Sequence, residues 1–226
     1  MNCLTASNIS YTYQSKYQKV EALKEVSCTF ERGKLYGIIG HSGSGKTTLV
    51  SLLAGLGTPD KGVILADGED IGQIGYERHR RENVSVIYQS FHLFPTLTLL
   101  ENVMYPMGIV KTPRKEAKAR AEALLESVGL TRKLQGKFPA MLSGGEQQRG
   151  AIARALAGKA ETILGDEPTG NLDSENGKIV MDILESLVRE KNFCVVVVTH
   201  DREIAARADM VYEMRDGRIV KVYEKH

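Results

Sequence analysis

The sequence Gly40-His-Ser-Gly-Ser-Gly-Lys46-Thr47 fits the pattern G-x-x-x-x-G-K-[ST] of a phosphate-binding loop. It follows a short apolar run, Leu35–Ile39, typical of a strand buried on both faces, and residues 47–54 after it have helical character. The glycines let backbone N–H groups turn toward one point, and the start of the helix adds its positive end. A glycine-rich turn could match by chance, but the strand before it and the helix after it favour the phosphate-binding interpretation.

Two side chains of this loop are predicted to have separate tasks. Lys46 is expected to reach the β- and γ-phosphates of a nucleotide, and the hydroxyl of Thr47 is expected to ligate Mg²⁺. The predicted nucleotide contacts in the loop are Gly40, His41, Ser42, Gly43, Ser44, Gly45, Lys46, Thr47 and Thr48.

Strands alternate with helices along the rest of the chain, which predicts an α/β domain with a mostly parallel sheet covered by helices. Thr112-Pro113 is a helix start with Thr as N-cap, Ser143 and Glu146 form a capping box, and Asp173 can cap a third helix. The predicted strands are Ile9–Tyr13, Val26–Phe30, Leu35–Ile39, Val84–Tyr88, the run before Asp166, and Phe193–Val198.

Two adjacent carboxylates, Asp166 and Glu167, follow the apolar residues Ile163-Leu164-Gly165. Because the carboxyl ends of parallel strands meet at one edge of a sheet, we expect both to lie beside the phosphate loop. Asp166 could then hold Mg²⁺, directly or through water, and Glu167 could accept a proton from an attacking water. The alternative is that both carboxylates only cap the turn.

A neutral polar residue follows each of two further predicted strands. His200, after Val195–Val198, could donate to a γ-phosphate oxygen, and Gln89, after Val84–Tyr88, could orient a water or complete the Mg²⁺ shell. A lone His after a strand is more often structural, and lone Gln residues are common. Neither pattern by itself distinguishes a catalytic role from a structural one.

Composition narrows the class of protein. Thirty Lys and Arg against 28 Asp and Glu leave a formal charge of +2, which argues against binding of bare nucleic acid. The longest apolar run is Phe193–Val198, whereas a membrane span needs about 20 residues. No secretory signal is visible at the N-terminus. The three widely spaced cysteines indicate buried, reduced thiols, so we expect an intracellular chain without a membrane span.

The stretch Leu142-Ser-Gly-Gly-Glu-Gln-Gln-Arg149 adds a resemblance. With the phosphate loop upstream and Asp166-Glu167 downstream, the chain resembles the ATP-binding-cassette (ABC) ATPases along its whole length, and LSGGEQQR resembles that family's signature. The resemblance implies a P-loop NTPase (RecA-like) core with an N-terminal antiparallel β subdomain and an inserted α-helical subdomain. It implies one domain over residues 1–226, with core and β subdomain in 1–90 and 141–226 and the helical insert in 91–140.

The resemblance also implies roles for residues that were ambiguous alone. Tyr13 resembles the aromatic residue that stacks on adenine, Gln89 resembles the glutamine of the loop that links the catalytic core to the helical insert, and His200 resembles the switch histidine. Catalysis would rest on Glu167, His200, Gln89 and Lys46, and Mg²⁺ on Thr47, Gln89 and Asp166. The signature residues that would touch the ATP of a partner subunit are Leu142, Ser143, Gly144, Gly145 and Glu146, with Asp173 in the loop that meets the partner.

A physical argument supports the pairing of two copies of the chain. Ser143-Gly-Gly145 begins a helix, which is a second phosphate-seeking N-terminus, and two such termini cannot easily crowd one γ-phosphate within one compact subunit. The resemblance implies that two copies pair head to tail with ATP between one copy's phosphate loop and the other's signature. A chain with one cassette would therefore form a homodimer.

Residues 83–103, 166–174 and 199–201 resemble those of the macrolide-exporter, lipoprotein-release and bacitracin-efflux ATPases. This likeness implies Mg-dependent ATP hydrolysis coupled to an integral membrane permease, at the cytoplasmic face of the cell membrane. The alternatives are a soluble ABC ATPase and a nucleotide-gated scaffold, and the presence of Glu167 and His200 disfavours the scaffold.

Two local features leave questions for the structure. Phe91, Leu93, Phe94 and Pro95 either pack the helical insert onto the core or line a groove for a cytoplasmic helix of the permease. Gly150 and Gly165 stand where a larger residue is usual in the family and are expected to loosen local packing.

Overall fold

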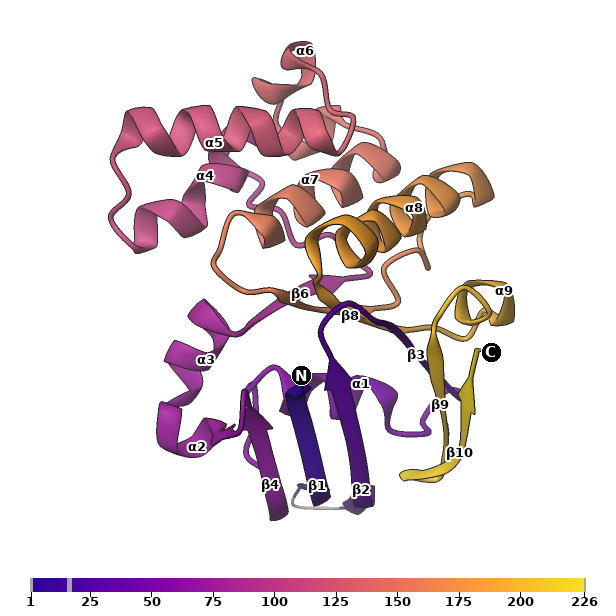
Figure 1. Ribbon diagram of the computed structural model, residues 1–226. Helices are drawn as coiled ribbons and strands as arrows, with labels where there is room; N and C mark the ends of the chain where they lie inside the picture. The colour runs from indigo at the N-terminus through magenta and orange to yellow at the C-terminus, as the bar shows by residue number, and fades with distance from the viewer. Residues whose placement is uncertain (1, 16–17, 226) are drawn as a thin grey trace.

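The computed structural model describes residues 2–15 and 18–225 and contains two sheets with helices around them (Figure 1). A four-stranded antiparallel sheet has the order β2-β1-β4-β5, and a six-stranded sheet has the order β10-β9-β3-β8-β7-β6. The strands are β1 (Asn2–Gln14), β2 (Lys19–Glu31), β3 (Leu35–Ile39), β4 (Lys61–Ala66), β5 (Glu69–Asp70), β6 (Val84–Tyr88), β7 (Thr162–Asp166), β8 (Cys194–Val198), β9 (Met210–Arg215) and β10 (Arg218–Glu224).

Helices lie on both faces of the six-stranded sheet, as the alternation of strands and helices predicts. No helix in the described part of the chain is both long and apolar enough to span a bilayer. The helices are α1 (Lys46–Leu53), α2 (Ile71–Ile74), α3 (Tyr76–Glu82), α4 (Leu99–Ile109), α5 (Arg114–Ser127), α6 (Arg132–Gln135), the 3₁₀ turn η1 (Pro139–Met141), α7 (Gly144–Leu156), α8 (Ser174–Lys191) and α9 (Arg202–Ala205).

The six-stranded sheet has parallel pairing at its centre. β3 pairs with β8, β8 with β7, and β7 with β6, all parallel, whereas the pair β9 and β10 at one end is antiparallel. Every residue of β8 is buried, as expected for a strand covered on both faces. The loops that follow β3, β6, β7 and β8 therefore begin at one edge of the sheet.

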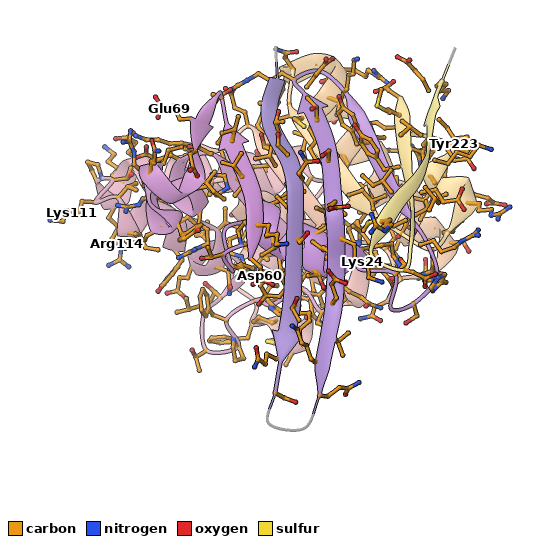
Figure 2. The ribbon with its side chains drawn as sticks, turned by 90° about the horizontal axis from the view of Figure 1, so that it is seen from below. Lys24, Asp60, Glu69, Lys111, Arg114 and Tyr223 are labelled. Carbon is orange, nitrogen blue, oxygen red and sulfur yellow. The ribbon has the colours of Figure 1, made fainter. Side chains whose placement is uncertain are left out.

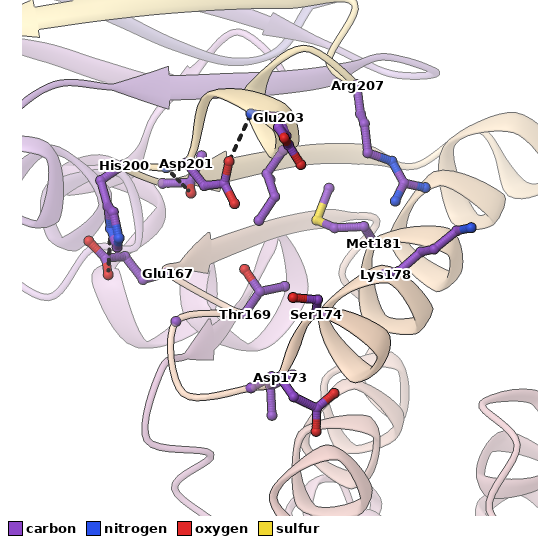
Figure 3. Close-up of a pocket in the computed structure, with 15 residues that line it drawn as sticks. Glu167, Thr169, Asp173, Ser174, Lys178, Met181, His200, Asp201, Glu203 and Arg207 are labelled. Carbon is purple, nitrogen blue, oxygen red and sulfur yellow. Dashed lines mark hydrogen bonds and ion pairs between the residues drawn. The ribbon is translucent and has the colours of Figure 1, made fainter.

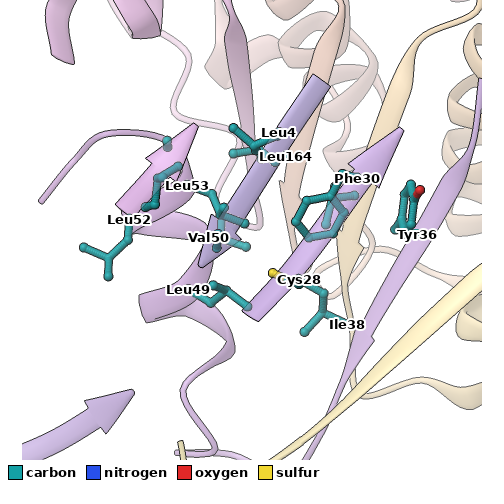
Figure 4. Close-up of a cluster of buried hydrophobic side chains, with 14 of the residues drawn as sticks. Leu4, Cys28, Phe30, Tyr36, Ile38, Leu49, Val50, Leu52, Leu53 and Leu164 are labelled. Atoms are coloured by element: carbon teal, nitrogen blue, oxygen red, sulfur yellow. The ribbon is translucent and has the colours of Figure 1, made fainter. Parts of the chain in front are cut away.

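Helix α1 is sandwiched between the two sheets. Its Leu49, Leu52 and Leu53 share one core cluster with Phe30 of β2 and Tyr36 of β3, and Figure 4 shows these side chains together. All three cysteines, Cys3, Cys28 and Cys194, are buried and free of disulfides, as predicted. The core of the four-stranded sheet thus fixes the helix that follows the phosphate loop.

A second core cluster lies on the other face of the six-stranded sheet. It joins α8 to the sheet and unites α4, α5 and α7, which lie in the upper part of Figure 1. Residues 91–140 contain α4, α5 and α6, and α4 begins with a capping box between Thr98 and Glu101. The predicted start of α5 is wrong by one residue, because Pro113 has extended backbone angles and is itself the N-cap in place of Thr112.

Gly150 and Gly165 permit close packing, so the expectation that they loosen it is wrong. A Cβ on Gly150 of α7 would lie 2.5 Å from Leu99 Cδ1 of α4, and Leu99 is fully buried. A Cβ on Gly165 of β7 would lie 3.1 Å from Cγ of the Pro168 ring, which folds back over the strand. Each glycine makes room for a large neighbour.

Replacing Gly150 with Ala should therefore destabilise the protein. Overpacking a core costs about 1–3 kcal/mol, and the better helix propensity of Ala returns about 1 kcal/mol. We expect a net loss of about 1 kcal/mol in the free energy of unfolding, measured by urea denaturation. In the double variant Leu99→Val/Gly150→Ala, the smaller partner should remove most of the penalty, so a double-mutant cycle would give a favourable coupling. Strict additivity of the two changes would contradict this packing argument.

Candidate active site

The phosphate loop connects β3 to α1 and depends on glycine for its shape. Gly43 and Gly45 have φ angles of +77° and +101°, in the left-handed region that glycine adopts without strain. A Cβ on Gly45 would also lie 2.6 Å from the carbonyl oxygen of Ala22. The hydroxyl of Ser44 is buried without a hydrogen-bond partner in the described part of the chain. The loop thus carries a buried polar atom suited to a ligand.

Lys46 lies at the start of α1 and is almost fully buried. Its Nζ donates to the carbonyl oxygens of Gly40 at 2.8 Å and His41 at 2.9 Å. Burial lowers the pKa of the Lys46 ammonium, although the nearby carboxylates of Glu167 and Asp166 act in the opposite direction. A phosphate placed on this loop would further favour the charged form of Lys46.

Asp166 ends β7 next to the phosphate loop. The hydroxyl of Thr47 donates to Asp166 Oδ1 at 3.2 Å, which joins residues 119 positions apart in the chain. Burial raises the pKa of the Asp166 carboxyl, the hydrogen bond from Thr47 opposes the rise, and the adjacent Glu167 adds to it. A hydroxyl and a carboxylate at this spacing are oxygen ligands of the kind Mg²⁺ prefers, so these residues fit that ion.

Glu167 has an unusual backbone with φ of +49°, and its N–H donates to the carbonyl oxygen of Val198 in β8. His200 Nδ1 lies 3.3 Å from Glu167 Oε2 (Figure 3). The side chain of His200 is largely exposed and that of Glu167 is about a quarter exposed. Strain of this kind persists where the surrounding structure over-determines it, and it clusters at functional sites.

Gln89 follows β6 and pairs with Asn171. Gln89 Nε2 donates to Asn171 Oδ1 at 3.2 Å, and Asn171 Nδ2 donates to the Gln89 carbonyl oxygen at 3.1 Å. Gly170 lies between the two loops, since a Cβ there would be 2.8 Å from Gln89 Nε2 and 3.2 Å from Glu167 Oε2. The sequence places Asn171 in the loop from Gly170 to Asp173 that is expected to meet the partner subunit, but it gives the Asn171 side chain no role of its own.

Tyr13 of β1 lies at the other side of the phosphate loop. Its hydroxyl and Thr48 Oγ1 are 3.3 Å apart, and half of the Tyr13 surface is exposed. Tyr11 packs its ring edge-on against that of Tyr13, with centroids 5.0 Å apart. His41 remains exposed at the tip of the loop, where its Nδ1 lies 2.8 Å from the carbonyl oxygen of Ser42.

The signature residues lie on the opposite face of the sheet from α1. Ser143 Oγ accepts from the Glu146 N–H and Glu146 Oε2 accepts from the Ser143 N–H, which is the predicted capping box of α7. A Cβ on Gly145 would overlap the side chain of Asn176 in α8. Leu142 is buried, and Gly144 lies against Phe91. Within residues 2–15 and 18–225 no hydrogen bond links these residues to the phosphate loop.

Asp173 caps α8 as predicted, accepting from the Asn176 N–H at 2.8 Å. It lines a cavity of about 480 Å³ with Glu167 and His200, and Figure 3 shows all three side chains around it. The structure thus brings together Lys46, Thr47, Asp166, Glu167, His200 and Gln89 near one sheet edge. It leaves the signature residues apart from that group.

A family model described as "ABC transporter" matches residues 23–170 of the chain. The chain belongs to the ABC transporter family. The lipoprotein-releasing system ATP-binding protein LolD of Pseudomonas fluorescens is 40% identical over 222 residues, which covers 97% of each chain. The macrolide export ATP-binding/permease protein MacB of Shigella flexneri is 41% identical over 96% of this chain, which corresponds to 34% of MacB.

A solved structure of a dimeric ATP-binding cassette in a post-hydrolysis state, bound to ADP and phosphate, has a TM-score of 0.90. It is 33% identical, with 98% of each chain covered. The expected fold of the ABC ATPases is thereby confirmed, including the antiparallel sheet and the helices around the parallel sheet. The chain is an ATP-hydrolysing subunit of an ABC transporter. The comparisons favour this function over that of a soluble ATPase without a membrane partner.

If Tyr13 stacks on adenine, its ring and not its hydroxyl should carry the affinity of this ABC subunit for ATP. Tyr13→Ala should weaken ATP binding by about 1–3 kcal/mol, the usual worth of base–aromatic stacking. Tyr13→Phe keeps the ring and loses only the contact with Thr48, so its affinity should change by less than about 1 kcal/mol. Isothermal titration calorimetry measures both. An equal loss in the two variants would assign the effect to the hydroxyl.

Proposed function

We propose that two copies of this chain hydrolyse Mg-ATP as a head-to-tail homodimer bound to the cytoplasmic face of a membrane permease. The observation that carries the proposal is the separation of two phosphate-seeking helix N-termini. Helix α1 packs in the core cluster on one face of the six-stranded sheet, and α7 packs in the cluster on the other face. A second copy would supply the α7 terminus to the phosphates held at α1 of the first.

The roles of the residues follow from their surroundings. Lys46 and the N–H groups of residues 40–48 hold the phosphates, and Tyr13 stacks on the base. Thr47, Asp166 and Gln89 would hold Mg²⁺, which would supply positive charge beside the phosphates. Glu167 accepts the proton of the attacking water.

His200 donates to a γ-phosphate oxygen. Leu142, Ser143, Gly144, Gly145 and Glu146 contact the ATP of the partner subunit, and the loop with Asp173 meets that subunit.

A groove beside α4 offers a place for the permease. It has a volume of about 750 Å³, and Phe94 packs against Tyr105 in it with ring centroids 4.6 Å apart. Leu93, by contrast, packs against the second core cluster, so of the predicted apolar cluster Leu93 belongs to the core and Phe94 lines the groove. Residues 91–140, as the helical insert, would form one wall of the groove, and 1–90 with 141–226 the catalytic body.

The charge of the groove favours an acidic partner. Its basic residues outnumber its acidic ones, which are Glu77 and Glu116. We therefore infer that its occupant is a short cytoplasmic helix of the permease with an apolar face and carboxylates beside it. The likeness to LolD and MacB supports a permease of the lipoprotein-releasing or macrolide-export kind. The basic lining residues are Arg80, Arg81, Arg120, Arg154 and Lys159.

Replacing Glu167 with Gln should separate binding from hydrolysis. The amide keeps the size of the side chain but cannot accept the proton, so steady-state hydrolysis should fall at least about 100-fold. ATP affinity should be retained, and an ATP-bound dimer should accumulate, measured by light scattering after size-exclusion chromatography. Turnover within about twofold of the original would remove Glu167 from the role of base.

Capture from detergent-solubilised membranes tests the permease. With Mg-ATP, the Glu167→Gln protein should retain a multi-span membrane protein in stoichiometric amount. Adding Phe94→Asp should abolish this capture, because it removes an aromatic contact and its carboxylate would compete with those of the partner for the basic residues of the groove. ATPase activity of the Phe94→Asp single variant should persist.

Tyr223→Asp is a matched control for this capture. Tyr223 is also a partly exposed aromatic residue, and it lies on β10 at the opposite side of the molecule from Lys111, which follows α4 (Figure 2). The control should capture the permease normally. If only the homodimer returned while ATP binding was intact, the soluble ATPase would become the better proposal.

A further inference from the structure

Gln148 is a fully buried polar residue of the signature helix α7. Its side-chain amide donates to two backbone carbonyl oxygens that belong to different loops. Nε2 lies 2.5 Å from the oxygen of Pro168 and 3.4 Å from the oxygen of Tyr88. One NH₂ group therefore joins helix α7 to two other segments, the end of β6 and the loop after β7.

Both carbonyl groups are directly next to a residue with a proposed part in hydrolysis. Tyr88 precedes Gln89, and Pro168 follows Glu167. The side chains of Gln89 and Glu167 approach each other on either side of Gly170, where a Cβ would lie 2.8 Å from Gln89 Nε2 and 3.2 Å from Glu167 Oε2. The position of the Gln148 amide thus bears on the distance between these two side chains.

Packing alone gives a poor reason for glutamine at this position. Gln148 Oε1 is buried and accepts no hydrogen bond from the part of the chain that the structure describes. A buried amide with an unpaired oxygen lowers stability, and an apolar side chain of similar volume would avoid that cost. The pair of hydrogen bonds to the two loops is what an apolar residue could not replace.

We propose that Gln148 is a positioning residue that sets the spacing of Gln89 and Glu167 for hydrolysis. The proposal rests on the roles proposed above for those two residues. Because Gln148 lies on the same helix as the cap residue Ser143, it also links the terminus offered to the partner's ATP to both loops of its own site. A phosphate engaged at the start of α7 would then hold the amide, and with it both loops, in one arrangement.

The test is a graded series at position 148 in the full-length chain. Gln148→Met keeps the length of the side chain and removes both donors, and Gln148→Asn keeps an amide that is one carbon too short. We expect kcat for ATP hydrolysis to fall about 10- to 100-fold in Gln148→Met, because small misplacements of catalytic groups have effects of this size. The kcat of Gln148→Asn should lie between those of the original protein and Gln148→Met. The KM for ATP of both variants should stay within about twofold of the original.

Gln135→Met is the matched control, because Gln135 is a second buried glutamine, in α6, whose Nε2 has no hydrogen-bond partner in the described part of the chain. This variant should keep its kcat. Circular dichroism melts would establish that all variants are folded, and if Gln148→Met were not, the comparison of Gln148→Asn with Gln135→Met would decide the matter. A kcat within twofold of the original in folded variants would overturn the proposal, and so would a rise in KM at constant kcat.

The two proposals can fail separately. If Glu167→Gln remained active, the roles assigned to the site would be wrong whatever Gln148 does. If Glu167→Gln were inactive and Gln148→Met fully active, the site would stand and only the positioning role of Gln148 would be lost.

Discussion

Parallel pairing of β3, β8, β7 and β6 is the constraint on which the rest of the structure depends. Parallel strands present their carboxyl ends at one edge, and the residues that follow these strands are Gly40, Thr199, Glu167 and Gln89. Residues far apart in the chain meet there without any long loop. The antiparallel sheet and α1 on one side, and α7 and α8 on the other, keep water from this ladder and so hold the edge in place.

Burial gives the site its charge balance. Lys46 loses hydration at the start of α1, and Asp166 loses hydration at the end of β7. Burial therefore disfavours the charged form of each, which lowers the pKa of Lys46 and raises that of Asp166. Their mutual attraction compensates only in part. A nucleotide with its metal brings both the anions that favour the ammonium and the cation that favours the carboxylates. The site is thus prepared electrostatically for a ligand that carries both signs of charge.

The strands of the parallel sheet, and the sheet edge at which the candidate site residues lie, could be predicted from the sequence because their signals are local. Leu35–Ile39 and Val84–Tyr88 are apolar runs that end at turn residues, and the structure has the same bounds. The short helix α2 and the antiparallel pair β9 and β10 were not predicted, because a helix of four residues has no period and half-exposed strands have a weak pattern. The effect of Gly150 on packing depends on its contact with Leu99, which is 51 positions earlier in the chain. No local sequence pattern indicates such a contact.

Gln148 lies in the signature stretch and Asn171 in the loop before Asp173, but the contacts of their side chains were not predicted, for a related reason. Gln148 stands in the polar run Glu146-Gln-Gln-Arg149, where composition cannot tell which side chain turns inward. In the structure each of the two residues uses an amide to bind the segment around Gln89, from α7 in one case and from the loop after Glu167 in the other. An amide both donates and accepts without charge, so it can join backbone to backbone where a buried ion would need a counter-ion. Residues of this kind are recognised only when the loops they join are seen together.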